Sequence, residues 1–409
     1  MAFTHGVYTQ ELDTKVYAVR EVDSALPFVV GVAPVHNLPS GTPQPINEPK
    51  LIFNFTEFVK TFGAPKDAED PSVFGLYEFA RVYFTLYGMS PAVFVNVFDP
   101  ANHTDASGNP DPTAVTAADV IGGVDATNGT RTGLELIEEV FPRFGKIVGL
   151  VLAPGFSHNT TVANALIAKA ESINQNFKAM AYIDVPDTAK TPTDAVAFKQ
   201  NFGSSHAVFF WPRAMEGDRA VPLSIHAAGL TAKVDRGNGG VPYESPSNKE
   251  LRVTGPEKIL TLQEANYLNE QGLVTMHRMM TGWKLWGNRT AAFPGVTDIK
   301  DSFIPCRRMA NWIENNLIVN TWQKVDDPMN KRLIESVVDT TNIWLNGLAG
   351  RGMLLGARVA FLPEENPETD LANGIIRFHI YYLAPPPAET IEFVLEVDLD
   401  YFKTLFGNA

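Results

Sequence analysis

The chain has 409 residues, of which 45% are hydrophobic and 19% are charged. A chain of this length exceeds the size at which one hydrophobic core keeps growing, so we expect two or more domains. The formal net charge of −13 would repel phosphate backbones, which argues against nucleic acid as a partner.

Targeting signals are missing from the sequence. The single cysteine, Cys306, excludes an intramolecular disulfide and is typical of a protein made in a reducing cytoplasm. The first residues show no basic region followed by an apolar one, so no secretion signal is predicted. No stretch approaches the ~20 apolar residues that a membrane span requires. We therefore expect a soluble protein made in a cytoplasm, without membrane insertion.

The N-terminal hundred residues indicate an arm followed by a folded segment. Residues 1–20, which include Phe3 and Val7, alternate in a way that predicts a short extended arm. Two apolar runs, 25–33 and 91–98, are typical of buried strands. Between them we predict two helices, one over 56–63 with Thr56 as N-cap and one over 72–87.

The middle of the chain alternates strands and helices. Residues 99–113 are rich in Asp, Pro, Asn and Gly, and we place a domain boundary there. After it, strands alternating with helices predict a mostly parallel α/β layer. Residues 213–260 are less regular and suggest a long surface excursion. The predicted segments are helices at 133–141, 161–174 and 193–201, and strands at 146–153, 179–185 and 207–211.

The C-terminal part is predicted to be mainly helical and to end in a second arm. We expect helices over 262–272, 301–319 and from Pro328 to Gly347, then strands at 359–361 and 375–382. Three consecutive prolines, 385–387, end this fold. Beyond them, residues 389–409 begin with a strand pattern, and an isolated terminal strand must pair with something. The alternating apolar residues are Ile391, Phe393, Leu395, Val397 and Leu399.

The sequence offers no recognisable motif for catalysis or cofactor binding. Phosphate-loop, dinucleotide, serine-hydrolase and zinc-protease motifs are missing from the sequence, so we expect no enzyme activity, cofactor or metal. Asp184 and Asp187 could form a carboxylate pair at a strand end, or simply cap the following turn. Ser157 and His158 are adjacent, which rarely aligns a nucleophile and its base. Cys306 is either an activated thiol or a half-buried helix residue.

The order of segments resembles the tail sheath family of contractile-tailed phages, R-type pyocins and related injection particles. The matching motifs are His5-Gly-Val-Tyr8, the Phe-Gly ending of the helix at 58–63, Gly133-Leu-Glu-Leu-Ile137, Val151-Leu-Ala-Pro-Gly155 and Ala181-Tyr-Ile-Asp184. The most specific is Trp286-Gly-Asn-Arg-Thr290, followed by the helical segment 307–314. The match covers roughly nine-tenths of the chain, and only 213–260 does not align.

The resemblance implies a mechanical function. Sheath subunits stack as hexameric rings around a tail tube between baseplate and tail terminator proteins, linked by N- and C-terminal arms that add strands to sheets of neighbouring subunits. Contraction would then eject the genome through the target cell envelope without a nucleotide. A C-terminal helix of this family faces the tube through charged residues, here Lys331, Arg332 and Glu335 on the helix from Pro328. A merely solvated helix face is the alternative.

We therefore expect an α/β protein with four parts. These are an N-terminal linking arm (1–20), an α+β inner body (21–98 plus 283–388), an inserted outer α/β domain (99–282) and a C-terminal linking arm (389–409). Three alternatives remain open. Both arms could pair within their own chain, the particle could be a non-phage injection system, or the chain could be an α/β enzyme or ligand-binding protein that uses the strand ends near Pro154 and Asp184.

Overall fold

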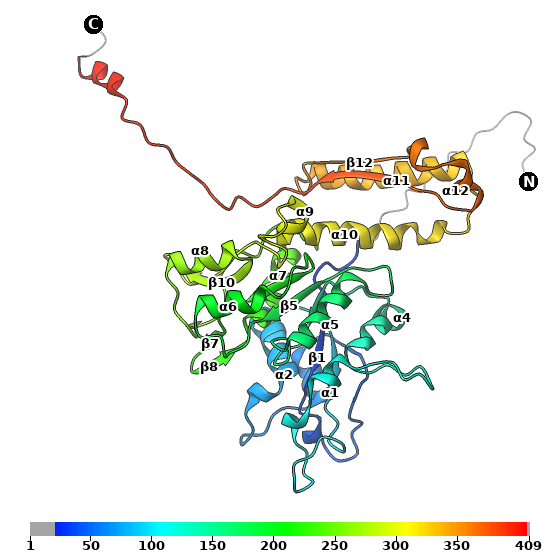
Figure 1. The fold of residues 1–409 in the computed structure, drawn as a ribbon, viewed down its shortest axis with the longest axis vertical. Helices are drawn as coiled ribbons and strands as arrows, with labels where there is room; N and C mark the ends of the chain where they lie inside the picture. Colours follow the sequence, from blue (N-terminus) through cyan, green and yellow to red (C-terminus); the bar gives the residue numbers. More distant parts are fainter. Residues whose placement is uncertain (1–20, 407–409) are drawn as a thin grey trace, which may run out of the picture.

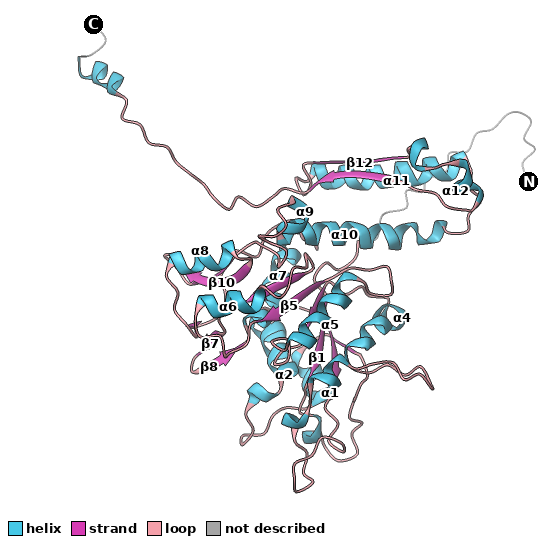
Figure 2. Ribbon diagram, in the orientation of Figure 1, coloured by secondary structure: helices cyan, strands magenta, loops and turns pink. Residues whose placement is uncertain are grey.

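The computed structural model describes residues 21–406, which form an α/β body, a helical layer along one side of it and a C-terminal segment that leaves both (Figure 1). Figure 2 shows the strands gathered inside the body with helices around them. The mixed α/β class predicted from the sequence is confirmed. Phe3 and Val7 lie outside the described residues.

An eight-stranded sheet forms the centre of the body, in the order β11-β10-β6-β5-β4-β1-β3-β2. The inner strands run parallel, and the edge strands β2 and β11 run antiparallel to their neighbours. Strands covered on both faces are apolar throughout, which is why they appear in the sequence as continuous apolar runs. The strands are β1 (Pro27–Gly31), β2 (Lys50–Ile52), β3 (Ala92–Asn96), β4 (Leu150–Leu152), β5 (Met180–Asp184), β6 (Ala207–Phe210), β10 (Leu273–Arg278) and β11 (Trp283–Trp286).

Helices cover both faces of this sheet. The rings of Phe198 and Phe209 lie 6.1 Å apart on one face, and those of Tyr182 and Phe210 lie 5.0 Å apart on the other. Consecutive strand residues point to opposite faces, so α6 (Phe198) and α7 (Thr231, bonded to Tyr182 at 3.0 Å) lie on opposite sides. The body helices are α1 (Phe55–Phe62), α2 (Gly75–Ala80), the π-helix η3 (Arg81–Leu86), α3 (Ala117–Ile121), η5 (Gly133–Glu139), α4 (Val140–Phe144), α5 (Thr160–Glu171), α6 (Pro192–Lys199), α7 (Leu223–Gly237) and α8 (Leu262–Glu270).

Two local predictions need correction. The N-cap of α1 is Asn54, whose side chain accepts the N–H of Glu57, and not Thr56. Residues 213–260 are not a surface excursion, because they contain α7, which is among the most buried helices of the body, and a small sheet of β7 (Ala214–Glu216), β8 (Arg219–Val221) and β9 (Gly255–Pro256). Residues 223–232 of α7 are all buried, so this part of the helix lacks the one-sided pattern by which surface helices are recognised.

The predicted division into an inner body and an inserted outer domain is also wrong. Strand β1 lies between β4 and β3, so residues 21–98 share a sheet and a hydrophobic core with residues 150–286. The loop at 99–113 does not separate two hydrophobic cores, because residues before and after it belong to the same core. A second, smaller core joins Met309, Trp312, Leu345, Leu348 and Val359 in the C-terminal layer.

The C-terminal layer consists of two long helices and a β-hairpin. Strands β12 and β13 pair antiparallel, with Val359 opposite Ile380, and α11 packs along them. Helix α11 begins after Asn330, which caps the N–H of Leu333, so Pro328 lies outside it. The elements are α9 (Ile299–Ser302), α10 (Ile304–Thr321), α11 (Lys331–Gly350), β12 (Gly356–Ala360), α12 (Glu368–Ala372) and β13 (His379–Leu383). Within residues 21–406, no helix has the length and apolarity to cross a bilayer.

Candidate functional site: the roots of the two arms

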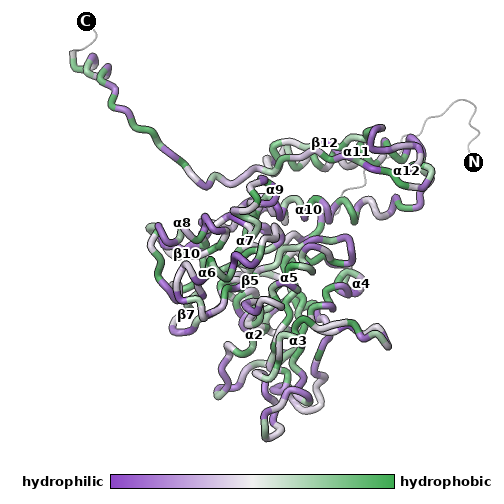
Figure 3. The backbone as a smooth tube through the Cα atoms, viewed as in Figure 1, coloured by the Kyte–Doolittle hydropathy of each residue, from purple (hydrophilic) through white to green (hydrophobic). Residues whose placement is uncertain are grey.

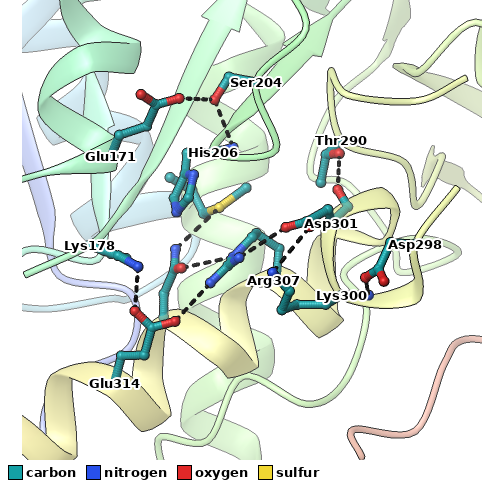
Figure 4. Close-up of polar contacts among 12 residues, drawn as sticks. Glu171, Lys178, Ser204, His206, Thr290, Asp298, Lys300, Asp301, Arg307 and Glu314 are labelled. Atoms are coloured by element: carbon teal, nitrogen blue, oxygen red, sulfur yellow. Dashed lines mark hydrogen bonds and ion pairs between the residues drawn. The ribbon is translucent and has the colours of Figure 1, made fainter. Parts of the chain in front are cut away.

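Helix α10 joins the C-terminal layer to the body through polar contacts, in which the buried Arg307 positions Glu314. Arg307 donates from Nε to Asn311 (2.9 Å), from Nη1 to Asp301 (3.0 Å) and from Nη2 to Glu314 (3.2 Å). Glu314 also pairs with Lys178, two residues before β5 (2.5 Å) (Figure 4). The layer is therefore fixed at the amino ends of the parallel strands, opposite to the edge where α/β enzymes bind ligands.

A buried ion pair strengthens the same junction. Arg308 of α10 donates to both carboxylate oxygens of Asp235 of α7, with a distance of 3.0 Å from Nη1 to Oδ1. The two side chains are 2% and 3% exposed. Ser24 Oγ donates to Asp235 Oδ2 at 2.5 Å, and the carbonyl of Ser24 accepts from Arg308. The chain therefore enters the body at Ser24, which contacts both residues of this ion pair.

The root of the N-terminal arm is held by side chains of the C-terminal layer. The N–H of Val22 donates to Asn316 Oδ1 (3.0 Å), and its carbonyl accepts from Trp312 Nε1 (2.9 Å). The preceding residue, Glu21, contacts Trp344 and Arg351 of the α11 region. Both backbone polar groups of Val22 are thus satisfied by side chains of α10.

The root of the C-terminal arm is held by the Trp286-Gly-Asn-Arg-Thr290 motif. Arg289 binds Glu389 Oε2 through Nε (3.1 Å) and Nη2 (2.6 Å). Its guanidinium also lies 4.3 Å from the ring centre of Phe293 and 3.8 Å from that of Phe303, a cation–π arrangement that fixes its direction. The motif thus has a structural explanation: it positions the arginine that anchors the arm.

The C-terminal arm leaves the body and exposes apolar side chains. Residues 384–398 form no strand and share no β-ladder with the rest of the described chain. Figure 3 shows hydrophobic and hydrophilic residues alternating along this arm, outside any core. The alternative in which the C-terminal arm pairs within its own chain is therefore wrong. The exposed fractions are 73% for Ile391, 83% for Phe393, 94% for Leu395, 85% for Val397 and 66% for Leu399.

The extended part of the C-terminal arm ends before the arm does. A 3-10 helix, η8 (Leu399–Phe406), follows it and exposes Tyr401 (73%), Phe402 (59%) and Leu405 (72%). Leu399, predicted as a strand residue, begins this helix. The Asp398 carboxylate accepts the N–H of Asp400, a side-chain turn that competes with continued strand geometry. The arm is thus an extended segment ending in an apolar and aromatic helical turn.

Comparison with known proteins identifies the family. A family model described as the phage tail sheath protein central domain matches residues 129–291. A putative prophage major tail sheath protein of Pseudomonas aeruginosa is 30% identical, covering 97% of both chains. The chain belongs to the tail sheath protein family.

Other relatives agree with this assignment. The tail sheath protein of Burkholderia phage BcepMu is 35% identical over 73% of this chain, and the match spans 65% of that relative's length. The tail sheath protein of Escherichia phage P2 is 26% identical over the whole chain. The sheath family is thus recognised among phage and prophage proteins.

Solved structures confirm the sheath fold. A chain of the anti-feeding prophage baseplate has a TM-score of 0.69 at 20% identity and covers 98% of this chain and 100% of that one. A sheath complex of an extracellular contractile injection system in its contracted state has a TM-score of 0.68 at 19% identity, covering 98% and 99%. These likenesses establish the sheath fold for the described part of the chain.

In this sheath protein, the candidate catalytic residues have structural partners. Asp184 accepts the N–H of Ser224, the second residue of α7 (3.0 Å), so it caps a distant helix and not the turn that follows it. Its burial raises the pKa of the carboxyl to about 6. The Ser157 hydroxyl accepts the N–H of Asp184 (3.1 Å). Burial raises the pKa of the Cys306 thiol to about 11, so this thiol is protonated at neutral pH.

The charged residues predicted to face a tube lie at an exposed helix start. Lys331 and Glu335 are 3.5 Å apart, with side chains 88% and 59% exposed. Lys331 and Arg332 occupy the first turn of α11, where positive charge opposes the helix dipole. Helix stability therefore does not explain these two basic residues. Within residues 21–406, no cluster of His, Cys, Asp and Glu could hold a metal ion.

Proposed function

We propose that this sheath protein polymerises as stacked hexameric rings around a tail tube, between a baseplate and a tail terminator. Contraction of this polymer would drive the tube through the target cell envelope and allow genome ejection. Synthesis and assembly take place in the bacterial host cytoplasm, and the product is part of the virion tail. The protein works without a cofactor, nucleic-acid partner, membrane insertion or catalytic step.

The observation that carries the proposal is the C-terminal arm. Exposure of five alternating apolar side chains to water is unfavourable in free energy, and burial through pairing would remove this cost. Burial of such a side chain is worth about 1.5–3 kcal/mol. Strand addition to a neighbouring subunit supplies both the hydrogen bonds and the burial. The N-terminal arm, with Phe3 and Val7, is proposed to act in the same way.

Linking by strands suits a polymer that changes shape. Backbone hydrogen bonds hold the arm firmly, whereas the spacer at residues 385–387 separates it from the body. The angle between subunits can then change while each link persists. The extended sheath would be a metastable lattice, and firing would shift it to a lattice with more favourable contacts, which requires no nucleotide.

A weak contact with the tube is proposed for Lys331, Arg332 and Glu335. An ion pair as exposed as that of Lys331 and Glu335 contributes about 0–1 kcal/mol, so its partners can be exchanged at little cost. Contraction must break every such contact, which favours many weak ones over a few strong ones.

A sheath of a non-phage injection particle is the second candidate. The full-length likeness to the anti-feeding prophage chain and to the contractile injection system sheath favours it. It differs from the first only in what the tube delivers. Particles from the producing host would distinguish the two, since only a phage tail is joined to a genome-filled capsid.

Electron microscopy of the full-length protein, produced together with the tube protein from the same source, tests the proposed function. We expect hollow striated tubes with six-fold end views, of two lengths before and after contraction. Dispersed subunits beside bare tubes, at concentrations where both proteins are abundant, would contradict it.

A further inference from the structure

One buried lysine of the body has no carboxylate partner. Lys199, the last residue of α6, is 4% exposed, and its ammonium donates to the carbonyl of Phe293. Within residues 21–406 it forms no ion pair, and burial alone lowers the pKa of this amine to about 8. A buried charge without a counter-ion costs stability, and the negative end of the α6 dipole offsets only part of that cost. Stability alone therefore does not explain this lysine.

The ammonium of Lys199 and two carbonyl oxygens gather around a glycine. Gly272 lies between α8 and β10 with a φ of 77°, a conformation that favours glycine. A Cβ atom at this position would lie 2.5 Å from the carbonyl oxygen of Phe293, 2.9 Å from that of Thr290 and 3.0 Å from Lys199 Nζ. Glycine thus leaves the space in which the ammonium reaches these carbonyls. Figure 1 shows α6 and α8 next to each other on the side of the body toward which the arm leaves.

Phe293 connects this ammonium to the anchor of the C-terminal arm. Its ring centre lies 4.3 Å from the Arg289 guanidinium, which the Phe303 ring also contacts. Arg289 in turn holds Glu389 through two hydrogen bonds. The contacts therefore run without a gap from α6 of the body, through Phe293 and Arg289, to the root of the arm.

The backbone of Phe293 has its other hydrogen bond within its own turn. Its N–H donates to the carbonyl of Thr290, three residues earlier (3.2 Å). The same segment is tied to the sheet at Ala291, whose N–H donates to the carbonyl of Ala207 (2.9 Å). Among the described residues, Lys199 thus supplies the hydrogen bond that joins Phe293 itself to a different element.

We propose that Lys199 is a positioning residue for the C-terminal arm: by holding the carbonyl of Phe293, it keeps the Phe293 ring against Arg289 and so sets the direction in which the arm leaves. This inference rests on the proposed function, in which that arm links subunits. The arm continues from β13 of the C-terminal layer, yet its direction is set by a helix of the body. The body and the arm are then oriented together.

Substitution of Lys199 by methionine tests the inference in the full-length chain. Methionine is a flexible side chain that is readily buried, but it leaves the Phe293 carbonyl without its donor. Spin labels at Thr56→Cys on α1 and Thr390→Cys, the residue after the anchored glutamate, report the spread of arm positions in dispersed subunits. Cys306 is buried and stays unlabelled. We expect Lys199→Met to widen the distribution of distances between the labels at least twofold.

Two further variants separate positioning of the arm from a general loss of stability. Lys169→Met removes a lysine of α5 whose partners are Glu135 and Glu138, and it should leave the width unchanged. Arg289→Ala should widen the distribution as Lys199→Met does. The two changes together should widen it no more than Arg289→Ala alone, because both act on one series of contacts. An unchanged width in either single variant, or additive widening, overturns the inference.

A pH series on the labelled chain that retains Lys199 does not depend on the folding of the methionine variant. With a pKa of about 8, the amine is mostly charged at pH 7 and mostly neutral at pH 9, and the charged donor makes the stronger hydrogen bond. The distribution should widen over this range by at least half of the widening caused by Lys199→Met, and that variant should show no change. A constant width with Lys199 in place contradicts the inference. A chain that forms no sheath with its tube contradicts the proposed function instead, and the label widths still decide the role of Lys199.

Discussion

Arg308 and Asp235 connect the helical layer to the body at a site from which water is excluded: their side chains are 2% and 3% exposed, and 73 positions separate them in the chain. The pair also contacts Ser24, so one buried charge cluster joins α7, α10 and the root of the N-terminal arm.

Removing one partner of this pair should be strongly destabilising. Asp235→Asn leaves the Arg308 charge buried without compensation, and we expect a loss of about 3–5 kcal/mol in the free energy of unfolding. Replacing both residues, as Asp235→Leu with Arg308→Met, should cost less than either single change. Chemical denaturation of dispersed subunits measures both. Equal losses for the single and the double variant would contradict this account.

Removal of residues 389–409 should abolish assembly and leave the body folded. The truncated segment contributes no buried hydrophobic residue to either described core, and its main contact with the body is the ion pair with Arg289. We expect a shift in the melting temperature of at most a few degrees, with no polymer by sedimentation. Glu389→Gln in the full-length chain is the matched control for loss of that ion pair. Normal polymers from the truncated protein would show that the arm does not link subunits.

Asp184 should make stability depend on pH. Its folded pKa of about 6 exceeds the ordinary value of 3.8, so the folded state holds the proton more tightly. The stabilising contribution is complete below pH 3.8 and is lost as the pH rises through 6. The stability of the native protein relative to Asp184→Asn should therefore fall by on the order of 2–3 kcal/mol between pH 4 and pH 7.

His206 is a control for which the pH dependence of stability has the opposite sign. Burial lowers the pKa of its imidazole to about 4 from 6.5, so its contribution is present above pH 6.5 and is lost as the pH falls through 4. His206→Gln should thus raise relative stability at low pH, whereas Asp184→Asn should lower it there. Unfolding curves at pH 4 and pH 7 decide both, and parallel pH profiles for the two variants would contradict the assigned shifts.

Charge reversal at the start of α11 separates tube binding from folding. Lys331→Glu with Arg332→Glu places negative charge where the helix dipole favours it, so the subunit should be as stable as before or gain about 0.3–1 kcal/mol. Co-assembly with the tube should nevertheless weaken. Lys300→Glu, on the short helix α9, is a control at a distance from this face. Unchanged loading of the tube would assign the charges to a solvated surface.

The strands of the body could be predicted because burial on both faces leaves continuous apolar runs. The predicted segments 25–33, 91–98, 179–185 and 207–211 each contain an observed strand. Their order in the sheet could not be predicted in the same way. Nothing in a local pattern indicates that β1 lies between β3 and β4, and this placement merges the two expected domains.

The arm was predictable, whereas its anchors were not. Alternation at Ile391 to Leu399 behind a proline spacer is a local signal. The contacts of Val22 with Trp312 and Asn316 span almost 300 positions and depend on the tertiary fold. The one available signal was the Trp286-Gly-Asn-Arg-Thr290 motif, whose arginine proves to hold Glu389.

Both arm roots attach to α10 within a short distance. Val22 is held at Trp312 and Asn316, and the carbonyl of Pro385 lies 4.0 Å from Cys306 Sγ, so the attachments are at most ten helical residues, or about 15 Å, apart. A force applied at one root can therefore reach the other along a single helix. Loops of the body that lie away from α10, such as residues 99–113, are not part of this connection, so their length can change without altering it.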